Sequence, residues 1–329
     1  MLNWRLWDGD TQKWDKLLQS FDDYSLYQSS AWGEHRSRFG WSPNRFQALS
    51  DGVPVAVAQV LVRKYPLGFA IAWIPGGPVG DMTAVGPALM EQIRVASGAR
   101  FLYCRFSAMR SREASEDTAL KEMSWHRTSS PLLTGLSLTY EPSLSEELRL
   151  NNCSGNWRHN LRRSMKRKLK TYHWVKACPQ EMMAAYAAMQ DHKQLAAQTS
   201  GYEIESLLKS FGSDCVVVRC DDEDGNLLAF RGALVLGAKA VDIFAVAIPA
   251  GRKVYASHSA FWELMKQCAA KGVQWYDMSG ADPEKNKGVY DFKKGTGAKD
   301  IQYLGEWECA KPALLRGLVS RVIRYRGRA

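Results

Sequence analysis

Two adjacent lysines lie in a glycine-rich cluster, Tyr290 to Gly297. The cluster follows a short β-branched and aromatic run at 273–277. It precedes a run at 301–307 in which apolar and polar residues alternate, as is typical of a strand. We therefore predict a glycine-rich turn between two strands, with lysines and free backbone N–H groups side by side. Such a turn suits an oxyanion or a phosphate; the alternative is a plain hairpin with solvated lysines.

Other residue types that carry chemistry are scattered. The six histidines have no metal-ligand spacing, so we predict no metal site, and no cofactor is expected. The seven cysteines form no paired C-x-x-C motif and are interpreted as reduced thiols of a cytoplasmic protein. No Ser-His-Asp or Cys-His pattern indicates a protein nucleophile. Asp277 and Asp291 are both candidates to accept protons, and the sequence does not choose between them.

A strongly basic segment spans residues 156–170 and contains seven Lys and Arg residues from position 158 onward. Trp157, Leu161, Met165 and Leu169 recur every four residues, which predicts an amphipathic helix with one narrow buried stripe. Charge of one sign at this density favours a polyanion over a merely solvated face. The candidate nucleic-acid contacts are Arg158, Arg162, Arg163, Lys166 and Arg167.

Length and composition indicate a packed protein of two domains. The chain has 329 residues, 46% of them hydrophobic, and 12 Trp, which excludes a disordered chain. The net charge of +10 favours an anionic partner, such as nucleic acid, a lipid headgroup or a phosphorylated substrate. No apolar run is long enough to span a membrane, and the start of the sequence has no signal-peptide core. A cytoplasmic location is expected.

One pattern of elements occurs twice: an antiparallel meander, a helix, and a further strand. The strongest local signal is Asp51-Gly52, which predicts a hairpin within 46–63. Ser29 or Ser30 is expected to cap the helix that carries Trp32.

The repeated pattern predicts an α+β protein in three parts. The first domain, 1–144, closes with a strand at 132–138, and the second, 145–309, closes with the strand at 301–307. A basic amphipathic helix at 310–329 either packs on a domain or lies at a membrane surface.

The C-terminal third resembles a known family. Its segments Y-D-M-S-G, G-V-Y-D-F-K-K-G-T-G and Y-L-G-E-W-E are similar to the signature of the FemABX aminoacyltransferases. The resemblance covers most of the chain, is strongest over 227–308 and is thin before residue 132. It implies two tandem acetyltransferase (GNAT)-like domains and transfer of an amino acid from aminoacyl-tRNA to an amino group of a peptidoglycan precursor. One departure is Thr296, where the motif commonly has an aromatic residue.

The resemblance also implies roles for particular residues. Lys293 would stabilise the oxyanion of the ester under attack, while the backbone near Phe292 holds the acceptor amine. An aminoacyl ester is already activated, so no nucleophile of the protein is needed. The residues expected to bind substrate are Lys294, Arg36 after the segment Q-S-S-A-W, and Tyr202 against the acceptor nucleotide; Arg158 matches a family arginine.

The segment Arg252 to Ser257 stands where acetyltransferases have a glycine-rich loop for the coenzyme A diphosphate. Tyr255 occupies the first glycine position, where a Cβ disfavours positive φ. We therefore expect no acetyl-CoA binding, and expect Tyr255 and Phe244 to offer aromatic surface to a substrate.

The sequence thus predicts an aminoacyltransferase that acts on a nucleotide- or lipid-linked envelope precursor, with peripheral membrane contact an option for its C-terminal helix. Two alternatives stay open. One is an acyl-CoA-dependent N-acyltransferase that acts on a sugar or polysaccharide precursor. The other is a non-catalytic protein that binds RNA or a membrane surface. Neither the amino acid nor the acceptor follows from the sequence.

Overall fold

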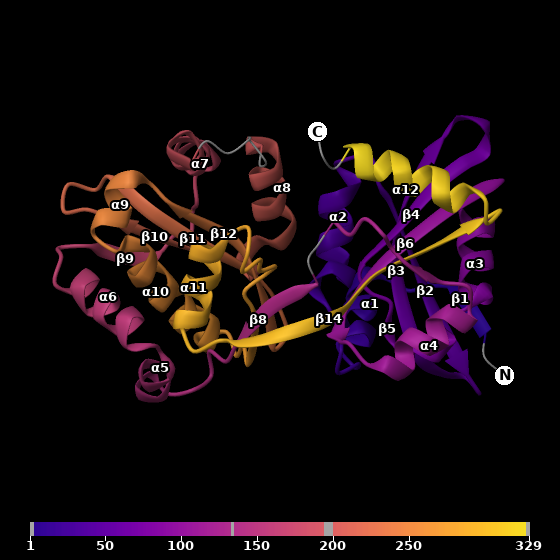
Figure 1. Ribbon diagram of the computed structural model, residues 1–329, viewed down its shortest axis with the longest axis horizontal. Coiled ribbons are helices and arrows are strands. Elements are labelled where there is room, and N and C mark those ends of the chain that lie inside the picture. Colours follow the sequence, from indigo (N-terminus) through magenta and orange to yellow (C-terminus); the bar gives the residue numbers. More distant parts are fainter. Residues whose placement is uncertain (1–2, 133–134, 194–199, 327–329) are drawn as a thin grey trace. The chain divides into compact units, whose positions relative to one another are not determined.

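The computed structural model describes residues 3–132, 135–193 and 200–326, which form two compact units (Figure 1). The first unit contains residues 1–136 and 302–329, and the second contains 137–301. The boundaries of these units differ from those of the two contiguous domains, 1–144 and 145–309, that the sequence predicts. The difference arises because two strands pair within the sheet of the other unit.

The sheet of the first unit has the strand order β1-β2-β3-β4-β6-β14, with β5 on β3 and β7 on β14. β4 and β6 run parallel, and the other neighbours are antiparallel. The predicted hairpin at Asp51-Gly52 is confirmed: both residues have positive φ, as a two-residue hairpin turn requires. The strands are β1 (Asn3–Leu6), β2 (Ser42–Ser50), β3 (Val53–Tyr65), β4 (Phe69–Gly76), β5 (Val79–Gly80), β6 (Phe101–Ser111), β7 (His126–Arg127) and β14 (Lys299–Lys311).

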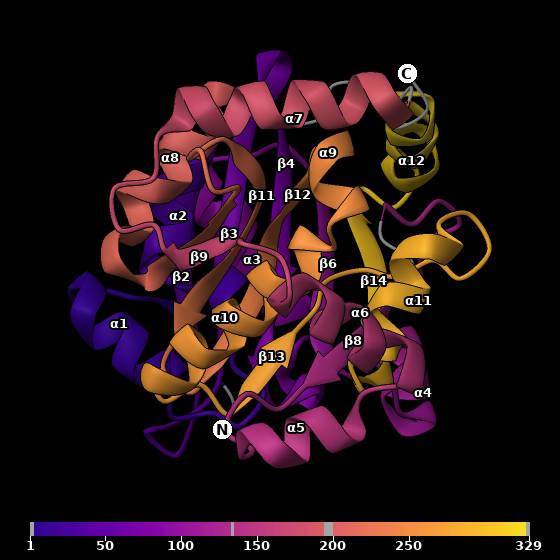
Figure 2. The same ribbon diagram turned by 90° about the vertical axis from the view of Figure 1, so that its left-hand side faces the viewer.

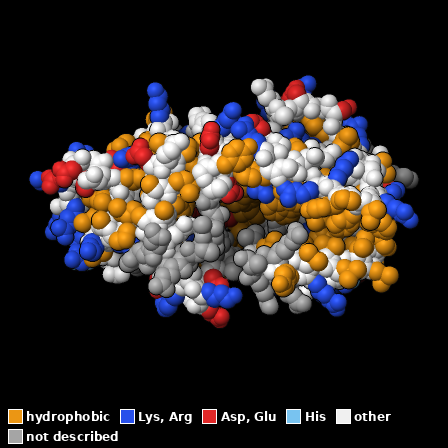
Figure 3. Space-filling model, turned by 90° about the horizontal axis from the view of Figure 1, so that it is seen from above, with side chains coloured by type: hydrophobic (Ala, Val, Ile, Leu, Met, Phe, Trp, Pro, Cys, Tyr) orange, Lys and Arg blue, Asp and Glu red, His pale blue; other side chains and the backbone are white. Residues whose placement is uncertain are grey.

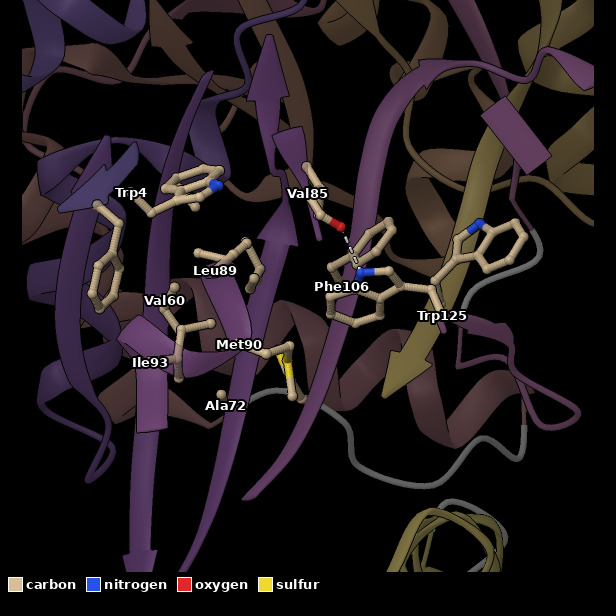
Figure 4. Packing of buried hydrophobic residues seen from close by; sticks show 14 of the residues in the cluster. Trp4, Val60, Ala72, Val85, Leu89, Met90, Ile93, Phe106 and Trp125 are labelled. Carbon is tan, nitrogen blue, oxygen red and sulfur yellow. Dashed lines mark hydrogen bonds between the residues drawn. The ribbon is translucent and has the colours of Figure 1, made fainter. Parts of the chain in front are cut away.

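The α-helices of this unit, among the residues that the structure describes, are α1 (Thr11–Leu18), α2 (Ser30–Ser37), α3 (Pro87–Ser97), α4 (Ala114–Glu122) and α12 (Leu315–Arg326). Ser29 caps α2, since its side chain accepts a hydrogen bond from the N–H of Trp32. Figure 4 shows Leu89, Met90 and Ile93 of α3 packed with strand residues in the core, where Trp125 donates to the carbonyl of Val85. Each fully buried aliphatic side chain of this kind contributes roughly 1.5–3 kcal/mol.

The sheet of the second unit has the order β8-β13-β12-β11-β10-β9, in which only β12 and β13 are parallel among the described strands. The long helix α10 contacts β9, β10 and β11, and α7 contacts β11 and β12 (Figure 2). The strands are β8 (Leu136–Tyr140), β9 (Lys170–His173), β10 (Cys215–Asp221), β11 (Leu227–Leu236), β12 (Lys239–Ala247) and β13 (Trp275–Asp277). The helices are α5 (Glu146–Asn152), α6 (Gly155–Met165), α7 (Pro179–Lys193), α8 (Gly201–Phe211), α9 (Pro249–Lys253), α10 (Ala256–Ala270) and α11 (Lys287–Gly295).

The repeated pattern is thus present: in each unit a meander leads through a helix to a strand that pairs in parallel. The closing strands differ from the prediction. β8 follows the first unit in the chain but pairs with β13 of the second. The end of β14 follows the second unit but pairs with β6 of the first. Side-chain patterns predict that a strand exists, and they do not say which edge it joins.

No helix in the described part of the chain is long and apolar enough to cross a membrane.

Candidate active site

A cavity of about 590 Å³ lies in the second unit, beside β12 and α11. Ile243 is an extra residue in β12, because Gly232 of β11 faces Phe244 while the next residue, Ala233, faces Asp242. Bulges of this kind commonly redirect side chains next to active sites. The cavity is lined by Met189, Arg231, Asp242, Ile243, Ala245, Ala247, Arg252, Ser257, Met278, Ser279, Asn286, Gly288, Val289, Phe292 and Lys293.

Lys293 lines this cavity with only 5% of its surface exposed. Its Nζ donates to the carbonyls of Ser279 (3.0 Å) and Gly280 (2.9 Å), and an ammonium has three N–H donors. Burial lowers the pKa of Lys293 below its ordinary value; the charge of Asp242 opposes this shift, and that of Arg231 adds to it. Lys293 is therefore a buried cation held in place by two carbonyls, and not the exposed lysine of a surface turn.

The segment around Lys293 is a helix, so the predicted glycine-rich turn is wrong. The N–H groups of Thr296 and Gly297 are not free, because they donate to the carbonyls of Lys293 and Lys294. A Cβ on Gly295 would lie 2.9 Å from the Trp157 ring, so this glycine permits close packing of α11 on α6. The glycines of this segment therefore serve packing and helix termination rather than anion binding.

Phe292 is half-buried in an aromatic cluster. Its ring centroid lies 5.0 Å from that of His258, 5.9 Å from Trp157 and 6.1 Å from Phe261. Burial, followed by the charge of Arg231, lowers the pKa of His258 to about 4, so this imidazole is neutral near pH 7. The cluster fixes Phe292 beside Lys293 at the wall of the cavity.

Arg231 was missed by the sequence analysis. It is 5% exposed, its Nη2 lies 3.4 Å from Asp242 Oδ2, and its guanidinium lies over the rings of Phe261 and Phe292. A usable signal existed: arginine is the single charged residue within the otherwise apolar segment L-L-A-F-R-G-A-L-V-L of β11. Charges in buried strands are costly and gather at functional sites.

Tyr255 and Phe244 have different environments. Tyr255 adopts the positive φ (60°) that a glycine would favour, and its hydroxyl accepts a hydrogen bond from Arg163 Nη1 (2.7 Å). The Arg163 guanidinium also lies 4.9 Å from the Tyr255 ring. Phe244 is 1% exposed and packs against Phe230. The expectation that Phe244 offers surface to a substrate is corrected, because its side of β12 faces the core.

The remaining predicted site residues are distributed over both units. In the first, Arg36 of α2 is half-buried, and its guanidinium lies over the rings of Phe39 and Trp73. In the second, Tyr202 is exposed in the first turn of α8, and Lys294 pairs with Asp300.

The two carboxylates also differ. Asp277 is 1% exposed and accepts from the N–H of Ser279 (2.6 Å), whereas Asp291 is exposed and pairs with Lys287. No candidate metal cluster occurs among the residues that the structure describes.

The basic segment is a helix only as far as Met165, and it reaches β9 through a short connection. Trp157 and Leu161 are buried as predicted, but Met165 is 59% exposed. Arg162, Arg163, Lys166 and Arg167 are exposed, and the side chain of Arg158 is half-buried and donates to the Asn151 carbonyl. The helix is therefore shorter than expected, but the exposed cations among the candidate nucleic-acid contacts are present on the surface.

Residues 216–316 match the model of the FemAB family, a range that contains the cavity's Arg231, Asp242, Phe292 and Lys293. The fold of the chain is similar to that of the crystal structure of FemX, with a TM-score of 0.81 at 16% identity over 97% of this chain and 100% of that one.

Two further solved structures have folds similar to that of this chain. A tandem GNAT protein from the clavulanic acid biosynthesis pathway has a TM-score of 0.58 at 11% identity, over 94% of this chain and 98% of that one. L-PGS from Bacillus licheniformis has a TM-score of 0.55 at 14% identity, over 95% and 97%. No curated protein sequence matches the chain.

Proposed function

We propose that this chain, whose residues 216–316 match the model of the FemAB family, is an aminoacyltransferase that moves an amino acid from an aminoacyl-tRNA to an amino group of a nucleotide- or lipid-linked cell-envelope precursor of peptidoglycan type. The observation that carries the proposal is the Lys293 ammonium, buried at the cavity wall beside Phe292 and held by two backbone carbonyls. A preorganised cation at a sheltered site is what an ester carbonyl under attack requires.

The reaction needs no covalent intermediate with the protein. The acceptor amine attacks the ester carbonyl, a C–N bond forms, and the C–O bond to the terminal ribose breaks. The ribose hydroxyl leaves with the proton that the amine gives up. In this proposal Lys293 stabilises the negative charge on the carbonyl oxygen, and the backbone near Phe292 holds the acceptor amine.

The donor would approach over α6, whose exposed Arg162, Arg163, Lys166 and Arg167 suit the phosphates of RNA. Arg163 is bonded to Tyr255 at the start of α10, and the neighbouring Arg252 and Ser257 line the cavity. The cationic surface and the cavity are thus joined within the second unit. Arg36, Tyr202 and Lys294 remain proposed contacts for the acceptor.

The α12 surface supports a further proposal, peripheral contact with a membrane. Leu314, Leu318, Val322 and Tyr325 of this region are 53–87% exposed, next to exposed Arg321. Figure 3 shows hydrophobic side chains gathered on the right-hand unit, with Lys and Arg side chains around them. Apolar side chains bordered by cations suit the surface of a bilayer that contains anionic lipids.

The test is a transfer assay with purified protein, a mixed pool of aminoacyl-tRNAs and several nucleotide-linked precursors. Formation of an amide product that requires the aminoacyl ester supports the proposal, and the labelled amino acid identifies the donor. Transfer from acyl-CoA instead would establish the N-acyltransferase alternative. Binding of RNA without any turnover would favour the non-catalytic alternative.

A further inference from the structure

Arg231 has hydrogen-bonding capacity that the described residues do not use. Its side chain is 6% exposed, and its Nε and Nη1 have no hydrogen-bond partner among the described residues. The ionic contact that it makes within the described part of the chain, from Nη2 to Asp242, is 3.4 Å long. Asp242 is itself shared, since its Oδ1 accepts from the Tyr276 hydroxyl at 2.8 Å.

This arrangement is costly in the absence of a ligand. A buried guanidinium needs several hydrogen bonds to offset its lost hydration, and a single long contact to a shared carboxylate gives little. The rings of Phe261 and Phe292, 5.3 and 5.0 Å from the guanidinium, attract its charge but accept no ordinary hydrogen bond. Unpartnered donors on a buried guanidinium that lines a cavity therefore point to an anionic ligand of that cavity.

The cavity supplies the place for that ligand. Arg231 lines it together with Lys293 and Arg252, and Asp242 is the one carboxylate among the lining residues. The lining thus carries three cations and one anion. The two unused donors of Arg231 and this excess of positive charge suit an oxygen anion, for which guanidinium groups are well shaped.

We propose that Arg231 binds an oxyanion that a substrate brings into this cavity, either a phosphodiester next to the terminal nucleoside of the RNA donor or a carboxylate of the acceptor. This role differs from that of Lys293, because a permanent charge on the substrate is bound before any reaction. The proposal rests on the proposed function only in naming these two sources. Binding of an anion can be measured without any transfer activity.

The first experiment measures the melting temperature of the full chain in increasing inorganic phosphate or acetate, with ionic strength held constant by chloride. The wild type should be stabilised in proportion to occupancy by at least one of the two anions. Arg231→Met should lose this rise. Without ligand it should melt at a lower temperature than the wild type, because the buried Asp242 carboxylate loses its cationic partner, so the readout is the anion-dependent rise and not the starting temperature. Arg231→Lys keeps the positive charge but loses the planar, forked set of N–H donors. It should therefore retain part of the anion-dependent rise in melting temperature.

Arg149 provides a matched control. It is also 5% exposed, also has Nε and Nη1 without partners among the described residues, and lies 4.8 Å from the Trp262 ring. It is not among the residues that line the cavity. Arg149→Met should keep the full anion-dependent rise.

The second experiment distinguishes the two sources by direct titration. One pair of probes is an RNA hairpin that ends in single-stranded CCA and the same hairpin without CCA. The other pair is an N-acetylated dipeptide with a free carboxylate and its C-terminal amide. Arg231→Met should weaken binding of the CCA hairpin or of the free carboxylate by roughly ten- to a hundredfold, the effect of hydrogen bonds to a charged group.

Loss of affinity for one member of a pair, with the other member unaffected, identifies the source. A phosphate-dependent rise that persists in Arg231→Met would reveal an adventitious ion elsewhere and overturn the proposal. So would a wild type that neither phosphate nor acetate stabilises, or unchanged titrations with both pairs of probes. If Arg231→Met does not fold, undiminished anion binding by Arg231→Lys together with a large loss of its stability would assign the residue to structure alone.

Discussion

At the scale of single residues, Lys293 shows how a correct residue can be predicted in a wrong setting. The motif identified the lysine, but the expected surface turn is a buried position with two carbonyl partners. Burial depends on what packs against α11, chiefly Trp157 and the residues around Ser279, and these lie far from it in sequence or belong to another element. A local pattern contains no information on such contacts.

Replacing Lys293 by Met should remove roughly 2.7–4 kcal/mol of transition-state stabilisation, which lowers turnover by two to three orders of magnitude. Methionine keeps much of the side-chain volume, so the variant should still unfold cooperatively in a thermal melt. Lys287→Met on the same helix, where the lysine is exposed and pairs with Asp291, is the control and should retain activity. Near-normal turnover in Lys293→Met would show that the oxyanion is stabilised by another group.

His258 gives a prediction about stability and pH. Its pKa is lowered to about 4 by burial and Arg231, against 6.5 for an ordinary histidine. Between these values the unfolded chain binds more protons than the folded one, so the contribution to stability is complete above about pH 6.5 and is lost as the pH falls towards 4. His258→Phe should reduce the loss of unfolding free energy between pH 7 and 4.5, measured by urea denaturation. His35 has the same lowered pKa of about 4 and remains in the variant, so part of the slope should persist; an unchanged slope would contradict the prediction for His258.

At the scale of elements, local sequence signals predict a turn and a helix start correctly where the signal depends on only a few neighbouring residues. The hairpin at Asp51-Gly52 and the cap at Ser29 agree with expectation. The turn predicted in place of α11 is wrong for a physical reason. Glycines near one another in sequence are typical of turns, but here Gly295 makes room for Trp157 and Gly297 adopts a positive φ beyond the helix end. Glycine does both, and only the neighbours decide.

For α6, the expected property is a strong salt dependence of RNA binding. Replacing Arg162, Arg163, Lys166 and Arg167 by Gln should flatten the slope of log affinity against log salt by roughly 0.7–0.9 for each phosphate that the variant no longer neutralises. The side chains are exposed, so the fold should be unaffected. Neutralising the four exposed lysines Lys121, Lys209, Lys285 and Lys299 in the same way controls for net charge alone. A slope that is the same in both variants would place the RNA elsewhere.

For the start of α10, we expect no acetyl-CoA binding. Tyr255 does adopt the positive φ that a diphosphate loop needs, so the obstacle is not the backbone alone. The obstacle is the Tyr255 ring, which its contacts with Arg163 hold in place. Calorimetric titration with acetyl-CoA at up to hundreds of micromolar should give no saturable heat. This corresponds to a binding free energy of about −5 kcal/mol or weaker. A micromolar dissociation constant would favour the acyl-CoA alternative, and Tyr255→Gly tests whether removal of the ring creates that affinity.

At the scale of the whole molecule, the sequence predicts two units of one fold but not how the chain is shared between them. The sequence places β8 in the first domain and β14 in the second. In the structure, β8 pairs with β13 of the second unit, and β14 pairs with β6 of the first unit. The C-terminal helix α12 therefore follows the first unit's sheet, where it contacts β6 and where Ser320 donates to Glu308 at 2.6 Å. Packing on a domain, one of the two expectations for this helix, is confirmed.

Packing does not remove the other option, because only one side of α12 is covered. Leu318, Val319, Val322 and Ile323 border an apolar groove with Tyr65, Phe69, Ile71 and Leu132. Leu314, Leu318 and Val322 are 87, 60 and 53% exposed, which is unusual for three aliphatic residues on one short segment. Arg321 lies on the same helix and is exposed, so the surface combines apolar and cationic side chains.

We expect the full chain to float with vesicles that contain anionic phosphatidylglycerol and not with neutral phosphatidylcholine vesicles. The double change Leu318→Ser and Val322→Ser should abolish flotation, since burial of these side chains supplies roughly 1.5–3 kcal/mol each, and Arg321→Gln should weaken it by about 1 kcal/mol. Val95→Ser, at an aliphatic residue that is 62% exposed on α3 outside the groove, is the matched control and should leave flotation unchanged. If the double variant floats as well as the wild type, the membrane contact lies elsewhere. If the wild type does not float with anionic vesicles, the groove has another occupant, and the lipid-linked acceptor loses its structural support relative to the nucleotide-linked one.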